Sequence, residues 1–134
     1  MRVLAKVPSL VEIALAHGIT LTSHQGGDKG RWHPSSRTIS LRTGLPARAR
    51  RCTLAHELGH AILGHAAGDH LPQWLVEKQE RAADRWAADL LIDPHEYAEL
   101  ETIYEGHLGA IAADLGVTVS LLAVWRANLE KRSA

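Results

Sequence analysis

Apolar positions recur at helical spacing over most of this chain, and they alternate with polar positions in only one short region. A helix is predicted over residues 3–16, and Gly18 would end it. Residues 19–42 contain two short β-branched runs, ITLTS (19–23) and RTISL (37–41), separated by a glycine-rich turn. Such runs are typical of strands. This region predicts a small antiparallel sheet of two or three strands.

The rest of the chain carries helical patterns only. Gly44-Leu45-Pro46 opens a helix that is predicted to continue to about Ala67 and to end at Gly68. Further helices are expected over 77–92, which Asp93-Pro94 would close, over about 94–105 and 107–115, and from near Thr118 onward. No internal repeat or interdomain linker interrupts these patterns. The sequence therefore predicts one α+β domain over residues 1–134, mostly helical, with the small sheet near its N-terminal end.

Composition narrows the range of partners. Fifteen basic residues balance fifteen acidic ones, so the formal net charge is zero. Nucleic acid is therefore not expected as the main partner, because proteins that neutralise phosphates carry a basic excess. No apolar run is long enough to cross a bilayer, and the first residues lack a signal-peptide pattern. A cytoplasmic protein without membrane association is expected.

Cys52 is the only cysteine, and phenylalanine is absent. A single cysteine excludes both an intramolecular disulfide and a multi-cysteine metal site. Cys52 itself is expected on the rear of its helix as a small buried residue. The core must then rest on aliphatic residues and on the four tryptophans, all of which are expected to be buried.

The strongest chemical signal is the sequence HELGH at residues 56–60, a HExxH motif. Residues four apart share one face of a helix, so His56 and His60 can reach the same metal ion. Glu57 is rotated by about 100° and can reach a water bound to that metal. Leu58 and Ile62 place the histidine pair beside an apolar stripe, which favours a buried site over two surface histidines.

Two histidines do not complete a tetrahedral zinc site, so a third ligand is required. In metzincin peptidases this ligand is a histidine six residues after the second histidine of the motif. Here that position holds Ala66, and His65 is one residue, or about 100° of helix, out of register. The metzincin arrangement is therefore excluded.

A carboxylate from the following helix gives the alternative, a gluzincin-like site. Glu80 lies twenty residues after His60, and Asp84 follows it by four residues on the same helix face. Glu80 is the predicted third ligand, and Asp84 is predicted to accept a hydrogen bond from a ligating imidazole, with His56 as the expected donor. Glu77 competes for the ligand position, but the residue four after it is Arg81, whose charge is wrong for an acceptor.

With these two motifs, the chain resembles the ImmA/IrrE family of metallopeptidases. The resemblance covers RTISL (37–41), RRCTLAHELGHAILGH (50–65) and ERAADRWAADLLI (80–92), with Trp86 where the family has phenylalanine. It implies a zinc peptidase whose targets include helix-turn-helix repressors, often encoded in mobile elements or stress-response loci. The chain departs from the family pattern after Ile92, where the usual proline is displaced to position 94.

The predicted function is zinc-dependent endopeptidase activity on such a repressor, which would relieve repression. Zinc, held by His56, His60 and Glu80, would bind a water and polarise the scissile carbonyl. Glu57 would take the proton of the water and pass it to the leaving amine. The alternative is a non-catalytic, zinc-stabilised module that binds a repressor or DNA through its C-terminal helices. Glu57 favours the enzyme, because a structural zinc site needs no base.

Three further segments leave alternatives open. Residues 112–129 resemble a helix-turn-helix, but the basic residues of the last helix come late, which disfavours DNA binding. The strand at 37–41 is either a core strand or an edge that holds an extended substrate by main-chain hydrogen bonds. His65 and His70 are either surface residues or neighbours of the metal. The candidates for stabilising the oxyanion are Tyr97, Tyr104, His33 and His107.

Overall fold

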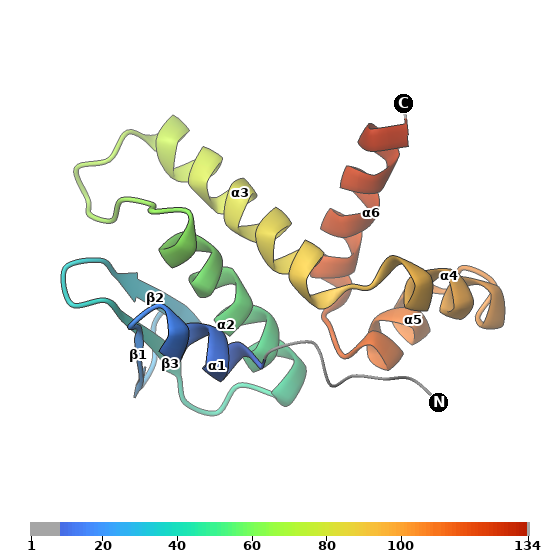
Figure 1. Cartoon of the computed structure of the whole chain (residues 1–134), viewed down its shortest axis with the longest axis horizontal. Coiled ribbons are helices and arrows are strands. Elements are labelled where there is room, and N and C mark those ends of the chain that lie inside the picture. The colour runs from blue at the N-terminus through green and yellow to red at the C-terminus, as the bar shows by residue number, and fades with distance from the viewer. Residues whose placement is uncertain (1–8, 134) are drawn as a thin grey trace.

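The computed structural model describes residues 9–133, so the predicted helix at 3–16 is described only in its second half. Figure 1 shows a small sheet at one end of the molecule and helices over the rest. The strands are β1 (Thr20–His24), β2 (Gly30–His33) and β3 (Thr38–Arg42). The helices are α1 (Leu10–Ala16), α2 (Ala47–Ile62), α3 (Gln73–Leu91), α4 (Pro94–Ile103), α5 (Leu108–Leu115) and α6 (Val119–Ser133). The predicted α+β class is confirmed.

The sheet is mixed, with β3 in its centre and β2 at one edge. β2 pairs antiparallel with β3, so that Trp32 lies opposite Ile39. β1 pairs parallel with β3, so that Thr20 lies opposite Thr38. The expectation of an antiparallel sheet is therefore right for one pair and wrong for the other. The reason is topological: the chain reverses twice, and β3 returns between the two earlier strands in the direction of β1.

Helix α2 lies between two hydrophobic clusters. One face packs on the sheet, where Ile39 and Leu58 are fully buried. The opposite face joins a cluster with the C-terminal helices, in which Ile111 and Leu122 are fully buried. Because apolar side chains cover α2 on both sides, the residues of this helix are held firmly in place.

Small residues allow α2 and α3 to approach closely. A Cβ added at Gly59 would lie 3.1 Å from the carbonyl oxygen of Ala83 and 3.3 Å from the ring of Trp86. Ala83 and Ala87 are completely buried in the contact. The two helices therefore lie side by side (Figure 1).

Helix α2 ends at Ile62, five residues before the predicted end. Gly64 has a left-handed backbone, with φ of +70°. Its N–H donates to the carbonyl of Ala61 (3.2 Å), and the N–H of His65 donates to that of His60 (3.0 Å). These two bonds form a Schellman motif, which satisfies the last carbonyls of the helix and turns the chain back. The predicted stop at Gly68 is therefore wrong.

The C-terminal helices are fixed to α2 by arginine side chains. Arg51 donates hydrogen bonds to the carbonyls of Leu115 (3.1 Å) and Gly116 (2.8 Å), at the turn between α5 and α6. Arg48 donates to the carbonyl of Val117 (3.3 Å). Within residues 9–133 no single helix is long and apolar enough to cross a membrane, and α5 and α6 meet that condition only together, across a 103° bend.

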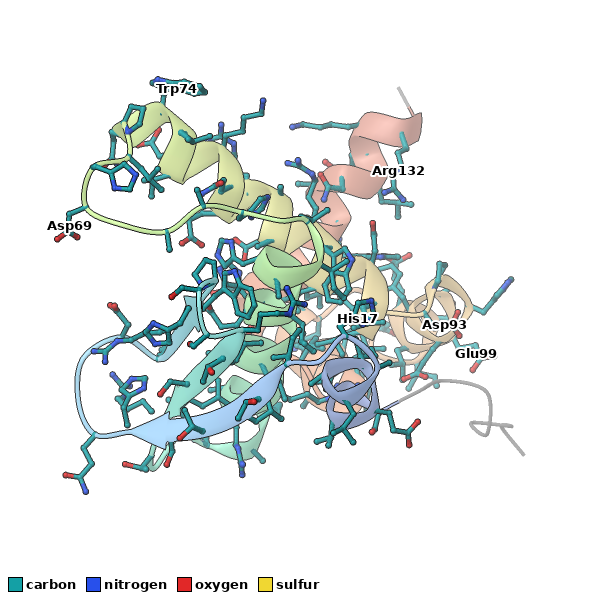
Figure 2. The ribbon with its side chains drawn as sticks, turned by 60° about the vertical axis from the view of Figure 1, so that its left-hand side comes forward. His17, Asp69, Trp74, Asp93, Glu99 and Arg132 are labelled. Atoms are coloured by element: carbon teal, nitrogen blue, oxygen red, sulfur yellow. The ribbon has the colours of Figure 1, made fainter. Side chains whose placement is uncertain are left out.

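The tryptophans are not all in the core. Trp32 and Trp125 are buried, with exposed fractions of 9% and 5%. Trp86 is partly buried against the sheet cluster. Trp74, in contrast, is 64% exposed near the start of α3 (Figure 2). The expectation that all four are buried is therefore wrong for Trp74.

Candidate metal centre

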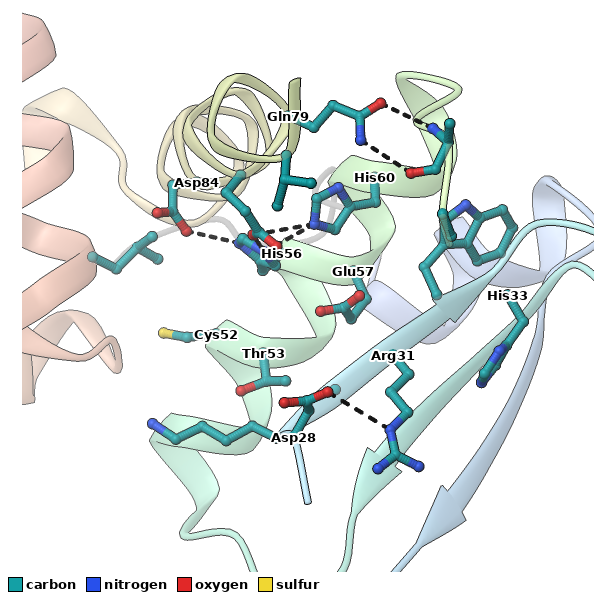
Figure 3. Close-up of a pocket in the computed structure, with 18 of the residues that line it drawn as sticks. Asp28, Arg31, His33, Cys52, Thr53, His56, Glu57, His60, Gln79 and Asp84 are labelled. Atoms are coloured by element: carbon teal, nitrogen blue, oxygen red, sulfur yellow. Dashed lines mark hydrogen bonds and ion pairs between the residues drawn. The ribbon is translucent and has the colours of Figure 1, made fainter. Parts of the chain in front are cut away.

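A cavity of about 850 Å³ opens between the edge strand β2, the helices α2 and α3, and the start of α6. His56, Glu57 and His60 enter it from α2, and Asp84 enters it from α3 (Figure 3). Glu80, also on α3, lines the same cavity. All five residues proposed from the sequence are therefore brought together at one place.

Three of these side chains direct one atom each toward a common point. The candidate ligand atoms of His56, His60 and Glu80 all lie within 4.8 Å of one another. The Nε2 atoms of the two histidines are 3.1 Å apart, and Glu80 Oε2 lies 3.3 Å from Nε2 of His60 and 2.6 Å from Nε2 of His56. In a tetrahedral zinc site with bonds of about 2.0–2.1 Å, ligand atoms are separated by about 3.3 Å. Two separations fit that value, and only the His56–Glu80 contact must lengthen.

Asp84 lies behind the ring of His56, where its spacing from Glu80 predicted it. The Nδ1 atom of His56 is 2.7 Å from Asp84 Oδ1, on the side of the ring opposite the converging Nε2. A hydrogen bond from Nδ1–H to the carboxylate leaves the lone pair on Nε2, which is the tautomer that a metal requires. Asp84 therefore has the geometry of an orienting partner.

The electrostatics of the cluster favour a bound cation. Burial alone lowers the pKa of His56, but its hydrogen bonds to Asp84 and Glu80 outweigh burial and raise that pKa to about 10. The hydrogen bonds from His56 and His60 lower the pKa of Glu80. The carboxylates thus hold a proton on the imidazole, and a divalent cation would compete for the same position. This donor set, two imidazoles and one carboxylate, fits zinc.

Glu57 stands beside the three converging atoms and does not belong to their group. Its side chain is only 7% exposed, and it points into the cavity (Figure 3). Burial raises the pKa of Glu57, and the nearby charges of His56 and His60 oppose that rise. The strand β2 passes directly over it, because a Cβ added at Gly30 would lie 2.9 Å from Cγ of Glu57. A buried carboxylate beside a metal centre is placed to accept a proton from water.

The comparison with protein families agrees with this geometry. A family model described as Peptidase_M78, IrrE N-terminal-like domain, matches residues 14–124. The chain belongs to this family. The match extends from α1 into α6 and includes every residue of the candidate centre, and the family indicates a metallopeptidase. The comparison with curated proteins finds no significant match.

The structure of this Peptidase_M78 domain adds one residue that the sequence did not assign to the centre. The Nδ1 atom of His65 lies 2.8 Å from Nδ1 of His60. Burial, followed by the charge of His60, lowers the pKa of His65. The sequence signal for this position of His65 is Gly64, which ends α2 and directs the chain back toward His60. His70, the other open candidate, does not line the cavity.

The structure decides one open alternative and corrects one expectation about neighbouring segments. The strand β3, at 38–42, is paired on both sides, so it offers no free edge to a substrate. The edge strand beside α2 is β2. Cys52 lines the cavity and does not lie on the rear of the helix, because it precedes His56 by four residues and shares its face. Its sulfur accepts a hydrogen bond from the N–H of Thr118 (3.4 Å).

Of the four oxyanion candidates, only His33 lines the cavity. The Tyr97 hydroxyl donates to Glu101, and the Tyr104 hydroxyl donates to Asp114. His107 caps the N-terminus of α5 by accepting a hydrogen bond from the N–H of Ala110. These three side chains are therefore used elsewhere in the fold.

Proposed function

We propose that this chain is a zinc-dependent endopeptidase that cleaves a helix-turn-helix repressor. The observation that carries the activity is the combination of three converging ligand atoms with a fourth, buried side chain, Glu57, that stands beside them. A structural zinc site closes its fourth position with a protein ligand, whereas a catalytic site keeps that position open.

Each residue of the centre has its own role in the proposed hydrolysis. A zinc ion bound there supplies Lewis acidity, which activates water and polarises a peptide carbonyl. His56, His60 and Glu80 hold the ion, and Asp84 keeps the ring of His56 in the required tautomer. Glu57 takes the proton of the attacking water and delivers it to the leaving nitrogen. Its burial favours this cycle, because it raises the affinity of the carboxylate for the proton.

A substrate chain has a place beside the centre. The outer edge of β2 is not paired with another strand in the described part of the chain, and residues 30–33 of this strand line the cavity. An extended peptide can add to such an edge through main-chain hydrogen bonds. Gly30 brings this edge close to Glu57, so a peptide bound along β2 would lie near the general base.

The repressor as substrate rests on the resemblance to ImmA/IrrE metallopeptidases, and the cytoplasmic location rests on the sequence expectation that the first residues lack a signal-peptide pattern. The helix-turn-helix-like pair, α5 and α6, does not favour DNA binding over the endopeptidase function. Ser120 and Leu121, in the first turn of α6, line the cavity, so the start of that helix faces the centre. A recognition helix would instead present its first turn to a DNA groove.

The test is the substitution Glu57→Gln, which nearly preserves shape and removes the base. This variant should keep zinc, fold and target binding. It should cleave a repressor encoded near this gene more slowly by at least about 10²- to 10⁴-fold, the usual contribution of general-base catalysis. Mass spectrometry of fragments after co-incubation measures the rate. Glu99→Gln is the matched control, because Glu99 is exposed on α4, away from the cavity (Figure 2).

The binding-module alternative gives a different result. If the native chain cleaves none of the neighbouring repressors, while the native and Glu57→Gln chains relieve repression equally, the endopeptidase proposal fails.

A further inference from the structure

The two histidines of the centre each use one ring nitrogen toward the converging point, so the second nitrogen of each needs a partner. For His56 that partner is Asp84. For His60, Nε2 faces His56 and Glu80, at 3.1 and 3.3 Å, while Nδ1 lies 2.8 Å from Nδ1 of His65. His65 is therefore on the opposite side of the His60 ring from the metal position, and it is not itself a candidate ligand.

The hydrogen-bond network assigns the protons of this pair. If Nε2 of His60 gives its lone pair to a metal, the proton of the neutral ring must be on Nδ1. That N–H points at His65, so Nδ1 of His65 must be the acceptor and Nε2 of His65 must carry its proton. Only one arrangement of protons satisfies both rings and leaves His60 ready to bind a metal.

The backbone is built to hold His65 in this position. In the Schellman motif that ends α2, His65 is the residue whose N–H returns to the carbonyl of His60. The next residue is fixed to α3 by two hydrogen bonds. The N–H of Ala66 donates to Oε1 of Gln79 (2.9 Å), and Nε2 of Gln79 donates to the carbonyl of Ala66 (3.0 Å) (Figure 3). Gln79 directly precedes Glu80, so the loop and the third ligand share one anchor.

We propose that His65 is a positioning residue that accepts the hydrogen bond of His60 Nδ1–H and so fixes the orientation and tautomer of that ring for metal binding. It would act on His60 as Asp84 acts on His56. The inference rests on the proposed metal site, and it assigns to His65 no contact with substrate.

Zinc affinity tests the proposal, with two neutral substitutions of similar size. His65→Leu removes the acceptor. His65→Asn retains one, because Oδ1 of asparagine is attached at the same position as Nδ1 of histidine. We expect His65→Leu to bind zinc about 10- to 100-fold more weakly than the native chain, the usual effect of losing such a partner. His65→Asn should recover most of that loss. His70→Leu, an exposed histidine in the same loop, should bind zinc like the native chain.

The affinities are measured by competition with a chromophoric chelator, and circular dichroism with thermal unfolding checks the fold of each variant. Zinc binding of equal strength in the native chain and His65→Leu overturns the inference alone. The same holds if His65→Asn binds as weakly as His65→Leu. A native chain that binds no zinc in this assay overturns the proposed metal site together with the inference.

A second measurement needs only the native chain and therefore does not depend on folded variants. In the zinc-loaded protein, proton–nitrogen NMR of the imidazoles should show His60 protonated at Nδ1, with a proton that exchanges slowly because it is hydrogen-bonded to His65. Zinc coordination through Nδ1 of His60, or a Nδ1 proton that exchanges as fast as that of an exposed ring, contradicts the proposal.

Discussion

The two histidines of the centre are four residues apart on one helix, yet they are supported by different parts of the fold. His56 is bonded to Asp84, 28 residues away on another helix, whereas His60 contacts His65, five residues away in the loop that ends its own helix. The first support depends on how α2 and α3 pack, and the second depends on how α2 ends. The partners also differ in charge, and a bond to a carboxylate is the stronger of the two kinds. A metal site can thus combine a long-range support with a local one.

The centre has a long-range half, His56 with Asp84, and a local half, His60 with His65. Glu80 contacts both histidines, so its loss should have the largest effect on zinc binding. Its Oε2 contacts Nε2 of both His56 and His60. Glu80→Ala should therefore reduce the zinc content from about one ion per chain to near zero, because two imidazoles alone do not complete the site. Metal analysis after dialysis measures this. Full zinc occupancy in Glu80→Ala would show that another residue is the third ligand.

Asp84 tests the long-range half by itself. Asp84→Ala should lower zinc affinity by about 10- to 100-fold and leave the fold intact, because the side chain is partly exposed and only its hydrogen bond to His56 is lost. Asp84→Asn should lose less, since the amide oxygen can still accept that bond. Competition with a chelator gives the affinities. Native-like affinity in Asp84→Ala would contradict the orienting role.

Gly59→Ala should weaken the same half through packing. The added methyl group would lie 3.1 Å from a backbone atom of Ala83, so α3 must move away from α2. The free energy of unfolding should fall by about 1 kcal/mol, the difference between overpacking and the gain in helix propensity. Zinc affinity should fall by less than in Asp84→Ala, while the slow Nδ1 proton of His60 persists. Disappearance of that proton in NMR spectra would show that the two halves are not independent.

Gly64→Ala tests the local half and should have the smallest effect on zinc. Gly64 has φ of +70°, and nothing lies within 4 Å of an added Cβ, so the cost is backbone strain of about 1 kcal/mol. Gly18→Ala is the matched control, because Gly18 has φ of +66° and is equally open. Both variants should unfold at lower temperature, but only Gly64→Ala should bind zinc more weakly. If Gly64→Ala and Gly18→Ala change zinc affinity equally, the end of α2 does not support the metal centre.

The parts of the site that depend on helical spacing could be predicted from the sequence. The positions of His56, His60, Glu80 and Asp84 follow from fixed helical spacings, and the structure brings all four together. Cys52 obeys the same spacing, because it lies four residues before His56, so its place in the cavity also follows from the sequence.

The parts that could not be predicted depend on competition between turns or on long-range pairing. Gly64 and Gly68 are both plausible helix ends, and the Schellman hydrogen bonds donated by Gly64 and His65 select the first, which brings the His65 side chain to His60. The parallel pairing of β1 with β3 leaves no local trace, because strand patterns look alike in either direction. That pairing places β2 at the free edge beside the centre.

Anomalous diffraction at the zinc edge, from crystals of the native chain grown with zinc, tests the central claim most directly. The account predicts one strong peak, about 2.0–2.2 Å from Nε2 of His56, Nε2 of His60 and a carboxylate oxygen of Glu80, with Glu57 not bound to it. A zinc ion bound through His65, or one whose fourth ligand is Glu57, would contradict it.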